Sequence, residues 1–326
     1  MTISVVIPAY NCADTIEDTL ESVFRQTSAP FEILVLDDGS TDGTPAALDR
    51  HKGRVSIFRQ PNRGVGPALN VLCEKAQGDV LAVLGSDDIW HPSYLATQIG
   101  VMREQPGGVA YFTGHINFTG SGGYRWASDH PLPLVTPKLF PSADFIRQYN
   151  KAAGPFTCMS YCCVDMRALK MLGREPFPLR IAEDFYFLNR LAALDFGPII
   201  YLSSPLVAYR VRAGSLSSNR LLVTESEVRA LELLEEDLTK INNSTFSAEF
   251  RRAFAAKRRV YAKALMGAGR RAEARNQFRE SLALFNNPTS QAKSLGLLLS
   301  TYLPEMLQPH WPQPGRDPRF DGRRSQ

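Results

Sequence analysis

Ile3-Ser4-Val5-Val6-Ile7 is the stretch that decides the fold class, together with two later runs of the same kind, Ile33-Leu34-Val35-Leu36 and Val80-Leu81-Ala82-Val83-Leu84. Each run is apolar without alternation, which indicates a strand buried on both faces of a sheet. Segments with helical periodicity, such as residues 65–76, follow these runs. Strands that alternate with helices of this length predict βαβ units and a doubly wound α/β sheet.

Polar residues follow these strands at the edge where such a sheet binds its ligands. They are Pro8-Ala9-Tyr10-Asn11, Asp37-Asp38-Gly39-Ser40 and Ser86-Asp87-Asp88. Two strands therefore bring paired carboxylates to one crevice. A divalent metal with a diphosphate would satisfy them, because hard oxygen ligands suit Mg²⁺ or Mn²⁺ and the metal stabilises a departing diphosphate. The alternative is a turn and helix start, but the second acidic strand end favours a ligand site.

The composition excludes several classes of protein. The chain has 326 residues, of which 44% are hydrophobic and 21% charged, so it is not disordered, collagen-like or a multi-span membrane protein, and its length predicts about two domains. Five cysteines, an odd number, predict no disulfide framework. With no leader-like start and no apolar segment of about 20 residues, we expect a cytoplasmic protein.

The basic residues are unevenly distributed. The net charge is +4, but residues 251–280 hold ten Lys or Arg against Glu273 and Glu280, which leaves the remainder at −4. A nucleic-acid enzyme would carry its positive surface beside its site, so we expect no nucleic-acid partner. We expect the helices that carry this segment to form a cap that packs on the rest of the chain. A peripheral contact of residues 251–280 with anionic lipid at the inner face of a membrane and a partner-binding surface are the alternatives.

We divide the chain at three points. Residues 1–106 hold the strands and polar strand ends described above, and residues 107–222 return to mixed structure after a stretch rich in Gly and Pro. Residues 223–310 show helical periodicity only, so they predict an all-helical C-terminal region. Residues 311–326, rich in Pro, Arg and Gly, are predicted to be disordered.

Four short motifs follow one another along the first third of the chain. They are Ser4 to Asn11, Asp37-Asp38-Gly39-Ser40-Thr41-Asp42-Gly43-Thr44, Asn62-Arg63-Gly64 with Ala68 and Asn70, and Leu84-Gly85-Ser86-Asp87-Asp88. In order and spacing they resemble the family 2 glycosyltransferases, over roughly residues 2–220. The resemblance implies a GT-A fold with a mixed sheet, in which residues 1–106 form the Rossmann-like half that binds the nucleotide sugar and residues 107–222 form the half that binds the acceptor. It also implies transfer of a sugar from a nucleotide-sugar donor, with inversion at the anomeric carbon.

The resemblance implies roles for the residues at the strand ends. Tyr10 would lie against the nucleobase, in a pocket shaped by Pro8. Asp38 would accept a hydrogen bond from the base imide, which favours a UDP- or dTDP-sugar. Asp87 would bind the metal, Mn²⁺ or Mg²⁺. The remaining implied contacts to the nucleotide sugar are Arg63 and Ser86.

The chain departs from the family's pattern at two positions. Gly85 stands where the first Asp of the Asp-x-Asp motif is common, and Arg212 stands where a His that can bind the metal is common. A guanidinium stays protonated and cannot ligate a metal. We therefore expect Arg212 to pair with the donor diphosphate bidentately and the requirement for metal to be weaker. A surface arginine without function is the alternative.

Glu183-Asp184 opens a predicted helix after a polar loop. Acidic residues there also serve as capping residues that the helix macrodipole favours, but the resemblance implies that one of the two is the catalytic base. Inversion in one displacement needs a carboxylate opposite the leaving diphosphate to take the proton of the acceptor hydroxyl. We assign Asp184 as the base and Glu183 as its orienting neighbour, with the reverse assignment as the alternative.

The predicted function is inverting transfer of a sugar from a UDP- or dTDP-sugar to a hydroxyl of a polysaccharide, a lipid-linked oligosaccharide or a protein glycan. One alternative is a nucleotide-sugar-binding module without catalysis, which Gly85 and Arg212 favour and Asp87 and Asp184 oppose. The other is a nucleotidyltransferase, but that class usually needs a Gly-rich basic loop after the first strand, and residues 9–14 supply none. The sequence predicts neither the sugar, the acceptor nor the oligomeric state.

Overall fold

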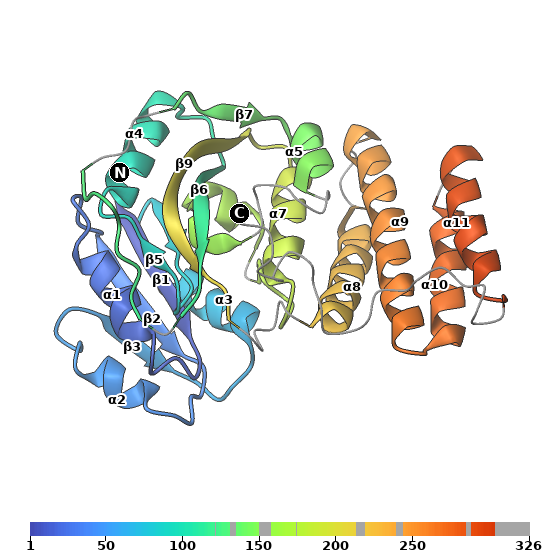
Figure 1. The fold of residues 1–326 in the computed structure, drawn as a ribbon. Helices are drawn as coiled ribbons and strands as arrows, with labels where there is room; N and C mark the ends of the chain where they lie inside the picture. Colours follow the sequence, from blue (N-terminus) through green and yellow to red (C-terminus); the bar gives the residue numbers. More distant parts are fainter. Residues whose placement is uncertain are drawn as a thin grey trace. The chain divides into compact units, whose positions relative to one another are not determined.

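The computed structural model describes residues 1–120, 122–130, 135–149, 158–173, 175–212, 219–238, 244–284 and 288–303. The chain forms two compact units, Met1–Arg212 and Ala213–Gln326. The described part of the first unit is a sheet with helices, and that of the second is helical (Figure 1). The predicted tail at 311–326 lies outside the described residues. The predicted donor and acceptor halves, 1–106 and 107–222, concern ligands and stay a prediction.

The sheet of the first unit runs in the order β3-β2-β1-β4-β8-β6-β9-β5, with β7 paired to β9. The strands are β1 Ile3–Ala9, β2 Glu32–Asp37, β3 Ser56–Arg59, β4 Val80–Val83, β5 Ile89–Trp90, β6 Ala110–Phe118, β7 Lys138–Phe140, β8 Cys162–Asp165 and β9 Ile199–Arg210. Strands β1 to β4 run parallel, whereas β8 is antiparallel to its neighbours β4 and β6. The predicted mixed sheet is confirmed.

Helices cover both faces of this sheet. They are α1 Ile16–Phe24, α2 Thr44–Asp49, α3 Val65–Lys75, α4 Tyr94–Glu104, α5 Ser142–Tyr149, α6 Met166–Met171 and α7 Glu183–Ala193. In Figure 1, α1 and α4 lie on one side of the strands and α3 and α7 on the other. Val5 of β1 and Leu81 of β4 are fully buried, as are Leu20 of α1 and Leu72 of α3. The apolar runs thus form the doubly covered centre of the sheet.

The ends of the first strands meet at one edge of the sheet. Ala9 at the end of β1 lies opposite Asp37 at the end of β2, and the N–H of Asp38 donates to the carbonyl of Ala9 at 2.8 Å. Beyond β4, the N–H of Leu84 donates to the carbonyl of Val6 at 3.0 Å. This pairing brings the polar residues that follow β1, β2 and β4 to the same edge.

The second unit is helical throughout its described residues. Its helices are α8 Arg220–Leu238, α9 Ser244–Gly267, α10 Arg271–Ala283 and α11 Pro288–Ser300. Leu231, Phe254 and Phe278, one each from α8, α9 and α10, are buried in its core. The predicted helical C-terminal region is confirmed. Within the described parts of the chain, no helix has the length and apolar character that crossing a bilayer requires.

Candidate active site

Asn11 joins the loops that follow β1 and β2. Its Oδ1 accepts a hydrogen bond from the N–H of Thr41 at 2.8 Å, and its own N–H donates to Oγ of Ser40 at 3.0 Å. Asn11 has a φ of +46°, in the left-handed region where Asn is enriched. The preceding Tyr10 is 47% exposed, and Pro8 is half-buried in β1. The two residues predicted to receive the nucleobase therefore lie at the edge where the first strands end.

Asp38 organises the loop that leads into α3. Its buried carboxylate accepts a hydrogen bond from Nε2 of Gln60 at 2.7 Å. It also accepts the backbone N–H groups of Arg63 at 3.0 Å and Gly64 at 2.7 Å. A carboxylate offers about four lone-pair positions, so one remains for a further donor such as a base imide. Arg63 contributes its backbone to this loop, while the residue itself is exposed.

Residues 177–180 contact α3 at Gly66 and at Asn70, of which Asn70 belongs to the third motif. A Cβ on Gly66 would lie 1.9 Å from the carbonyl oxygen of Leu179, so only glycine allows this approach. Nδ2 of Asn70 donates to the carbonyl of Phe177 at 2.9 Å, and its Oδ1 accepts the N–H of Phe177 at 3.0 Å. Residues 177–180, just before α7, are therefore held on the start of α3.

The same segment contacts the loop that Asp38 organises. Nη2 of Arg180 donates to Oδ1 of Asn62 at 2.7 Å, and the Arg180 side chain fills the space that a Cβ on Gly64 would need. Glu183 and Asp184, the two candidates for the catalytic base, begin three residues after Arg180, at the start of α7. The sequence motifs around Asp38 and α7 are thus joined by direct contacts.

Glu183 and Asp184 begin α7 after a strained residue. Ala182 has a φ of +61°, a left-handed conformation that costs a non-glycine residue about 1 kcal/mol or more. Burial, followed by the charge of Asp184, raises the pKa of Glu183 well above its usual range. Oδ1 of Asp184 accepts the N–H of Phe185 at 2.6 Å. A strained backbone that presents coupled carboxyl groups is typical of a functional site.

Asp88 is a buried carboxyl beside the predicted metal ligand Asp87. Its Oδ1 accepts the N–H of Arg210 at 2.9 Å. Burial, followed by the charge of Asp87, raises the pKa of Asp88 to about 8. A Cβ on Gly85 would lie 2.9 Å from Oδ2 of Asp88 and 3.0 Å from Oγ of Ser160. An Asp at position 85 would therefore clash with Asp88 and add a third carboxyl group. This explains locally why the chain has glycine at position 85.

Arg212 contacts Asp87 directly. Its Nη2 lies 2.6 Å from Oδ2 of Asp87, and the side chains are 44% and 23% exposed, respectively. We expected Arg212 to face the donor diphosphate, whereas its partner here is the carboxylate predicted to bind the metal. One side of that carboxylate is thus neutralised by a cation from the protein itself.

Arg210 supports both acidic residues, and our sequence analysis did not single it out. Its buried guanidinium donates from Nε to the carbonyl of Asp87 at 2.9 Å. Nη1 donates to the carbonyls of Gly120 at 2.5 Å and Gly122 at 3.0 Å. The only sequence signal is the position of Arg210 at the end of a strand, two residues before Arg212. Arg210 fixes the backbone of the acidic motif and the segment that passes over it.

Asp87 is the residue predicted to bind a divalent ion. Among the described residues, no group of three or more His, Cys, Asp or Glu could hold a metal. Mg²⁺ needs only one or two carboxylates when substrate phosphates complete its coordination, so an ion at Asp87 would share the donor's diphosphate. The neighbouring Ser86 is held beside the start of α1, because its carbonyl accepts a hydrogen bond from Oγ1 of Thr15, the residue before α1, at 3.0 Å.

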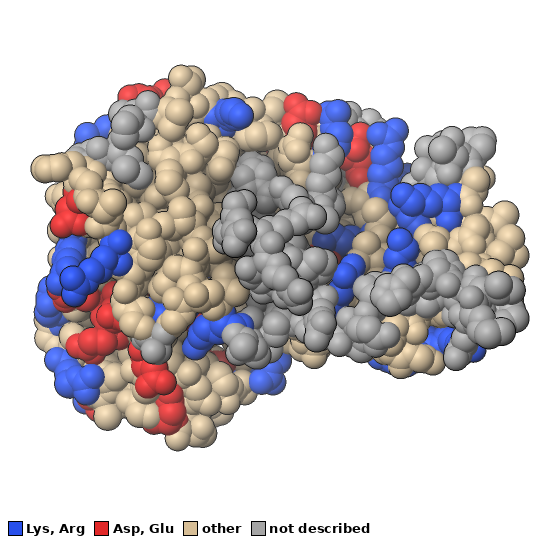
Figure 2. Space-filling view, in the orientation of Figure 1, with Lys and Arg blue, Asp and Glu red and all other residues tan. Residues whose placement is uncertain are grey.

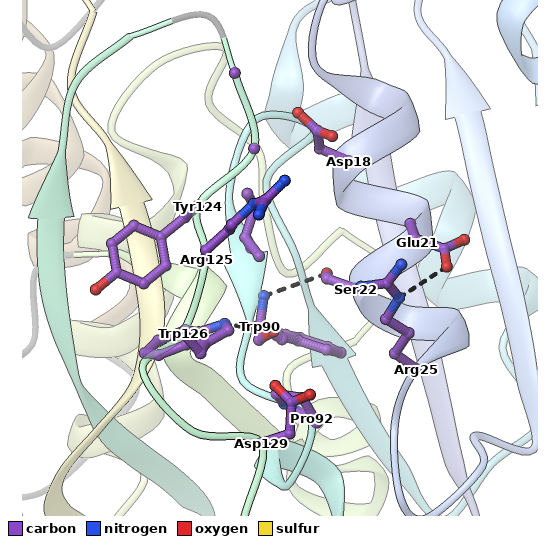
Figure 3. Close-up of a pocket in the computed structure, with 13 residues that line it drawn as sticks. Asp18, Glu21, Ser22, Arg25, Trp90, Pro92, Tyr124, Arg125, Trp126 and Asp129 are labelled. Carbon is purple, nitrogen blue, oxygen red and sulfur yellow. Dashed lines mark hydrogen bonds and ion pairs between the residues drawn. The ribbon is translucent and has the colours of Figure 1, made fainter.

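A cavity of about 700 Å³ lies between α1 and residues 122–129 (Figure 3). Asp18 and Glu21 of α1 form one wall, and Tyr124, Arg125 and Trp126 line the other, where the ring of Tyr124 points away from α1. Nε1 of Trp126 donates to the carbonyl of Trp90 at 3.2 Å. The cavity therefore combines aromatic and charged side chains. Ile89 and Trp90, which also line it, follow Asp87 closely in the sequence.

Comparison with known proteins identifies the family. Residues 4–170 match the model of glycosyl transferase family 2. This chain belongs to that family. The Escherichia coli UDP-Glc:alpha-D-GlcNAc-diphosphoundecaprenol beta-1,3-glucosyltransferase WfaP is 35% identical over 233 residues, which cover 69% of this chain and 84% of WfaP. TuaG of Bacillus subtilis is 38% identical over 117 residues, 35% of this chain. The chain spans about half of that relative, since the match covers 46% of TuaG.

Solved structures show that the fold is GT-A. The crystal structure of Staphylococcus aureus TarS 1-349 has a TM-score of 0.67 and 17% identity, and covers 92% of this chain and 90% of that one. Its complex with UDP-GlcNAc has a TM-score of 0.65. The mannosyltransferase PcManGT of Pyrobaculum calidifontis, in complex with GDP-Man and Mn²⁺, has a TM-score of 0.55, 19% identity and covers 92% of this chain and 80% of that one. The predicted family, fold and enzyme class, a glycosyltransferase, are confirmed.

Proposed function

We propose that this glycosyltransferase moves a sugar from a UDP- or dTDP-sugar to an acceptor hydroxyl, with inversion, in the assembly of a polysaccharide or another glycan. The observation that carries the proposal is the contact between the Asp38 loop and the segment before α7, through Arg180 and Asn62. It joins the predicted nucleotide pocket to the predicted base. The name of WfaP, a UDP-Glc-dependent glucosyltransferase, and the TarS complex with UDP-GlcNAc support this donor class.

The donor would bind along the strand ends. The exposed ring of Tyr10 offers a face to the base, and the remaining lone pair of Asp38 accepts the imide N–H of uracil or thymine. Arg212 and the carboxylate of Asp87 then flank the diphosphate. A Mn²⁺ or Mg²⁺ ion held by Asp87 would neutralise the charge that develops on the leaving diphosphate.

Asp184 is the residue that we assign as the base. Burial, followed by the charge of Asp184, raises the pKa of Glu183, so Glu183 is the less suited of the two carboxyls to act as the base. We therefore assign to Asp184 the step that takes the acceptor hydroxyl proton as the sugar is transferred. Glu183 then orients Asp184.

Donor binding and transfer test the proposal separately. Calorimetric titration with UDP, dTDP, GDP and CMP, with and without Mn²⁺, should show binding of UDP or dTDP. Asp184→Asn should keep this binding and lower kcat about 10²- to 10⁴-fold, the usual contribution of a general base. Glu183→Gln is the matched control and should lower kcat less. If the chain binds UDP but transfers no sugar, it is the nucleotide-sugar-binding module without catalysis. If it binds no nucleotide, the donor assignment is refuted.

We further propose that the cavity beside α1 binds part of the acceptor. Its support is chemical, because the ring of Trp126 with the carboxylates of Asp18 and Glu21 offers both an aromatic surface and hydrogen-bond acceptors. The acceptor would be a polysaccharide or a lipid-linked oligosaccharide, in keeping with the diphosphoundecaprenol acceptor in the name of WfaP. For such an acceptor we propose a cytoplasmic enzyme that works at the inner face of a membrane.

A further inference from the structure

Lys263 of α9 is half-buried and lies among three other cations. They are Arg220 at the start of α8, Arg259 one turn earlier on α9, and Lys293 of α11. Burial and the positive charges of Lys293, Arg259 and Arg220 lower the pKa of Lys263. We call these four residues the cation cluster. Three helices of the second unit thus bring their cations to one place.

A hydrogen bond between α9 and α11 sets the position of the cation cluster. Nη1 of Arg259 donates to Oγ of Ser294 at 3.3 Å, and Ser294 follows Lys293 directly in α11. Oγ of Ser294 also lies 2.8 Å from Oγ of Ser281 in α10, and both serines are fully buried. Because residues four apart lie on one face of a helix, Lys263 is on the same side of α9 as Arg259. The packing of these helices thereby fixes the backbone that carries the cations.

The charge of the cation cluster contrasts with that of its surroundings. Lys257, also on α9, is neutralised by Glu227 of α8, which lies 2.5 Å away. Within the part of the chain that the structure describes, no ion pair joins Lys263, Lys293 or Arg220 to a carboxylate. Figure 2 shows Lys and Arg side chains gathered over the helical unit on the face that it draws. The cluster therefore holds positive charge that the described residues do not balance.

Unbalanced charge of this kind favours the binding of an anion. Like charges repel more strongly where burial withdraws them from water, and an anion bound between them offsets that repulsion. A phosphate group suits the cation cluster, since its oxygens accept hydrogen bonds from ammonium and guanidinium groups and such charge-assisted bonds are strong. The other three cations all act on Lys263, so the cluster fits a compact group better than an extended polyanion such as nucleic acid.

We propose that the cation cluster is a binding site for a phosphate group, held by Lys263 and Lys293 with Arg220 and Arg259 beside them. The phosphate belongs either to a diphosphate compound in solution or to the head group of an anionic lipid, since both present the same charged oxygens. The site lies entirely within the second unit. It goes beyond the proposed function, because it takes no part in binding the donor or in sugar transfer.

Binding of two probes to the full chain tests the site. Inorganic pyrophosphate is titrated calorimetrically in EDTA with saturating UDP, which fills the proposed donor site. Phosphatidylcholine vesicles with and without phosphatidylglycerol are tested by co-sedimentation. We expect binding of pyrophosphate, which identifies a soluble source, or of the phosphatidylglycerol vesicles, which identifies a lipid. Lys263→Gln/Lys293→Gln should weaken this binding at least about tenfold, because one hydrogen bond to a charged group contributes about 1.5 kcal/mol or more. Lys293→Gln alone, at an exposed position, should weaken it by a smaller factor.

The matched control removes two cations elsewhere in the same unit. Arg229, about two and a half turns after Arg220 and so on the opposite side of α8, pairs with Glu232 at 3.3 Å, and Arg251 lies exposed in the first half of α9. Arg229→Gln/Arg251→Gln should bind the probe as the unmodified chain does. An equal loss in this control would overturn the location, and so would unchanged binding in the double variant of the cation cluster. Binding of neither probe would overturn the proposal. UDP titration of each variant without pyrophosphate tests the donor assignment separately.

Discussion

The ion pair between Arg212 and Asp87 leads to a prediction in which one substitution changes two affinities in opposite directions. Arg212→Gln should tighten Mn²⁺ binding to the enzyme without donor, because Asp87 loses a competing cation. The same change should weaken UDP binding when no metal is present, because the diphosphate loses a cationic partner. If Arg212 had no function, Arg212→Gln would change neither the Mn²⁺ affinity nor the UDP affinity.

The structure sets the size of both effects. The pair is close, at 2.6 Å, but Arg212 is 44% exposed, so water screens it and its contribution is at most about 1 kcal/mol. Mn²⁺ binding should therefore tighten up to about fivefold. A hydrogen bond to a charged group contributes about 1.5 kcal/mol or more, so UDP binding without metal should weaken at least about tenfold.

Isothermal titration calorimetry measures both affinities on the same preparation. Mn²⁺ is titrated into the enzyme alone, and UDP is titrated in the presence of EDTA. Arg50→Gln is the matched control, because Arg50 is a cation of the same unit whose ion pair with Glu17, at 3.3 Å, lies outside the site. Unchanged Mn²⁺ affinity together with unchanged UDP affinity in Arg212→Gln would refute the reasoning.

Three further predictions concern packing, titration and the cavity. Gly66→Ala should lower the free energy of unfolding by about 1–3 kcal/mol, because the new Cβ clashes with the carbonyl of Leu179. Gly100→Ala is the control, since the space around Gly100 is open, and it should not lower that free energy. Denaturant titration measures the free energy of unfolding of both variants. The raised pKa of Asp88 means that the folded state keeps a proton that the unfolded chain has released, so the free energy of unfolding of the metal-free protein should fall between pH 5 and 8. The slope is about 1.4 kcal/mol per pH unit, and Asp88→Asn should remove it; a slope that persists in this variant has another origin. Trp126→Ala should raise KM for the acceptor about three- to tenfold and leave UDP affinity unchanged; loss of UDP affinity instead would place the cavity on the donor side.

The sequence predicted the centre of the sheet well, because burial on both faces leaves a direct trace in composition. Val5 and Leu81 belong to continuous apolar runs, and both are fully buried. The polar residues that follow such runs must meet at one edge of a parallel sheet. The short antiparallel strand β8, Cys162–Asp165, leaves a weaker trace, because its apolar run, Cys162-Cys163-Val164, is only three residues long.

The arrangement around the acidic motif could not be predicted, because it depends on residues distant in the chain. Gly85 reads as a departure from a motif until Ser160 and Asp88 are seen to occupy the space where its side chain would lie. Arg210 is one arginine among many in the sequence, and only the fold brings its guanidinium to the carbonyl of Asp87. Periodicity and spacing report on neighbours along the chain, and these contacts lie across it.

The contacts of residues 62–66 limit how this enzyme can be re-engineered. The loop that carries the Asp38 contacts also supports residues 177–180, through Gly66 and through Asn62 with Arg180. Exchanging that loop alone for the equivalent loop of another glycosyltransferase would shift the start of α7 along with the predicted nucleotide pocket. A transplant that aims at a new donor therefore has to move both segments as one cassette, and natural changes in donor preference face the same constraint.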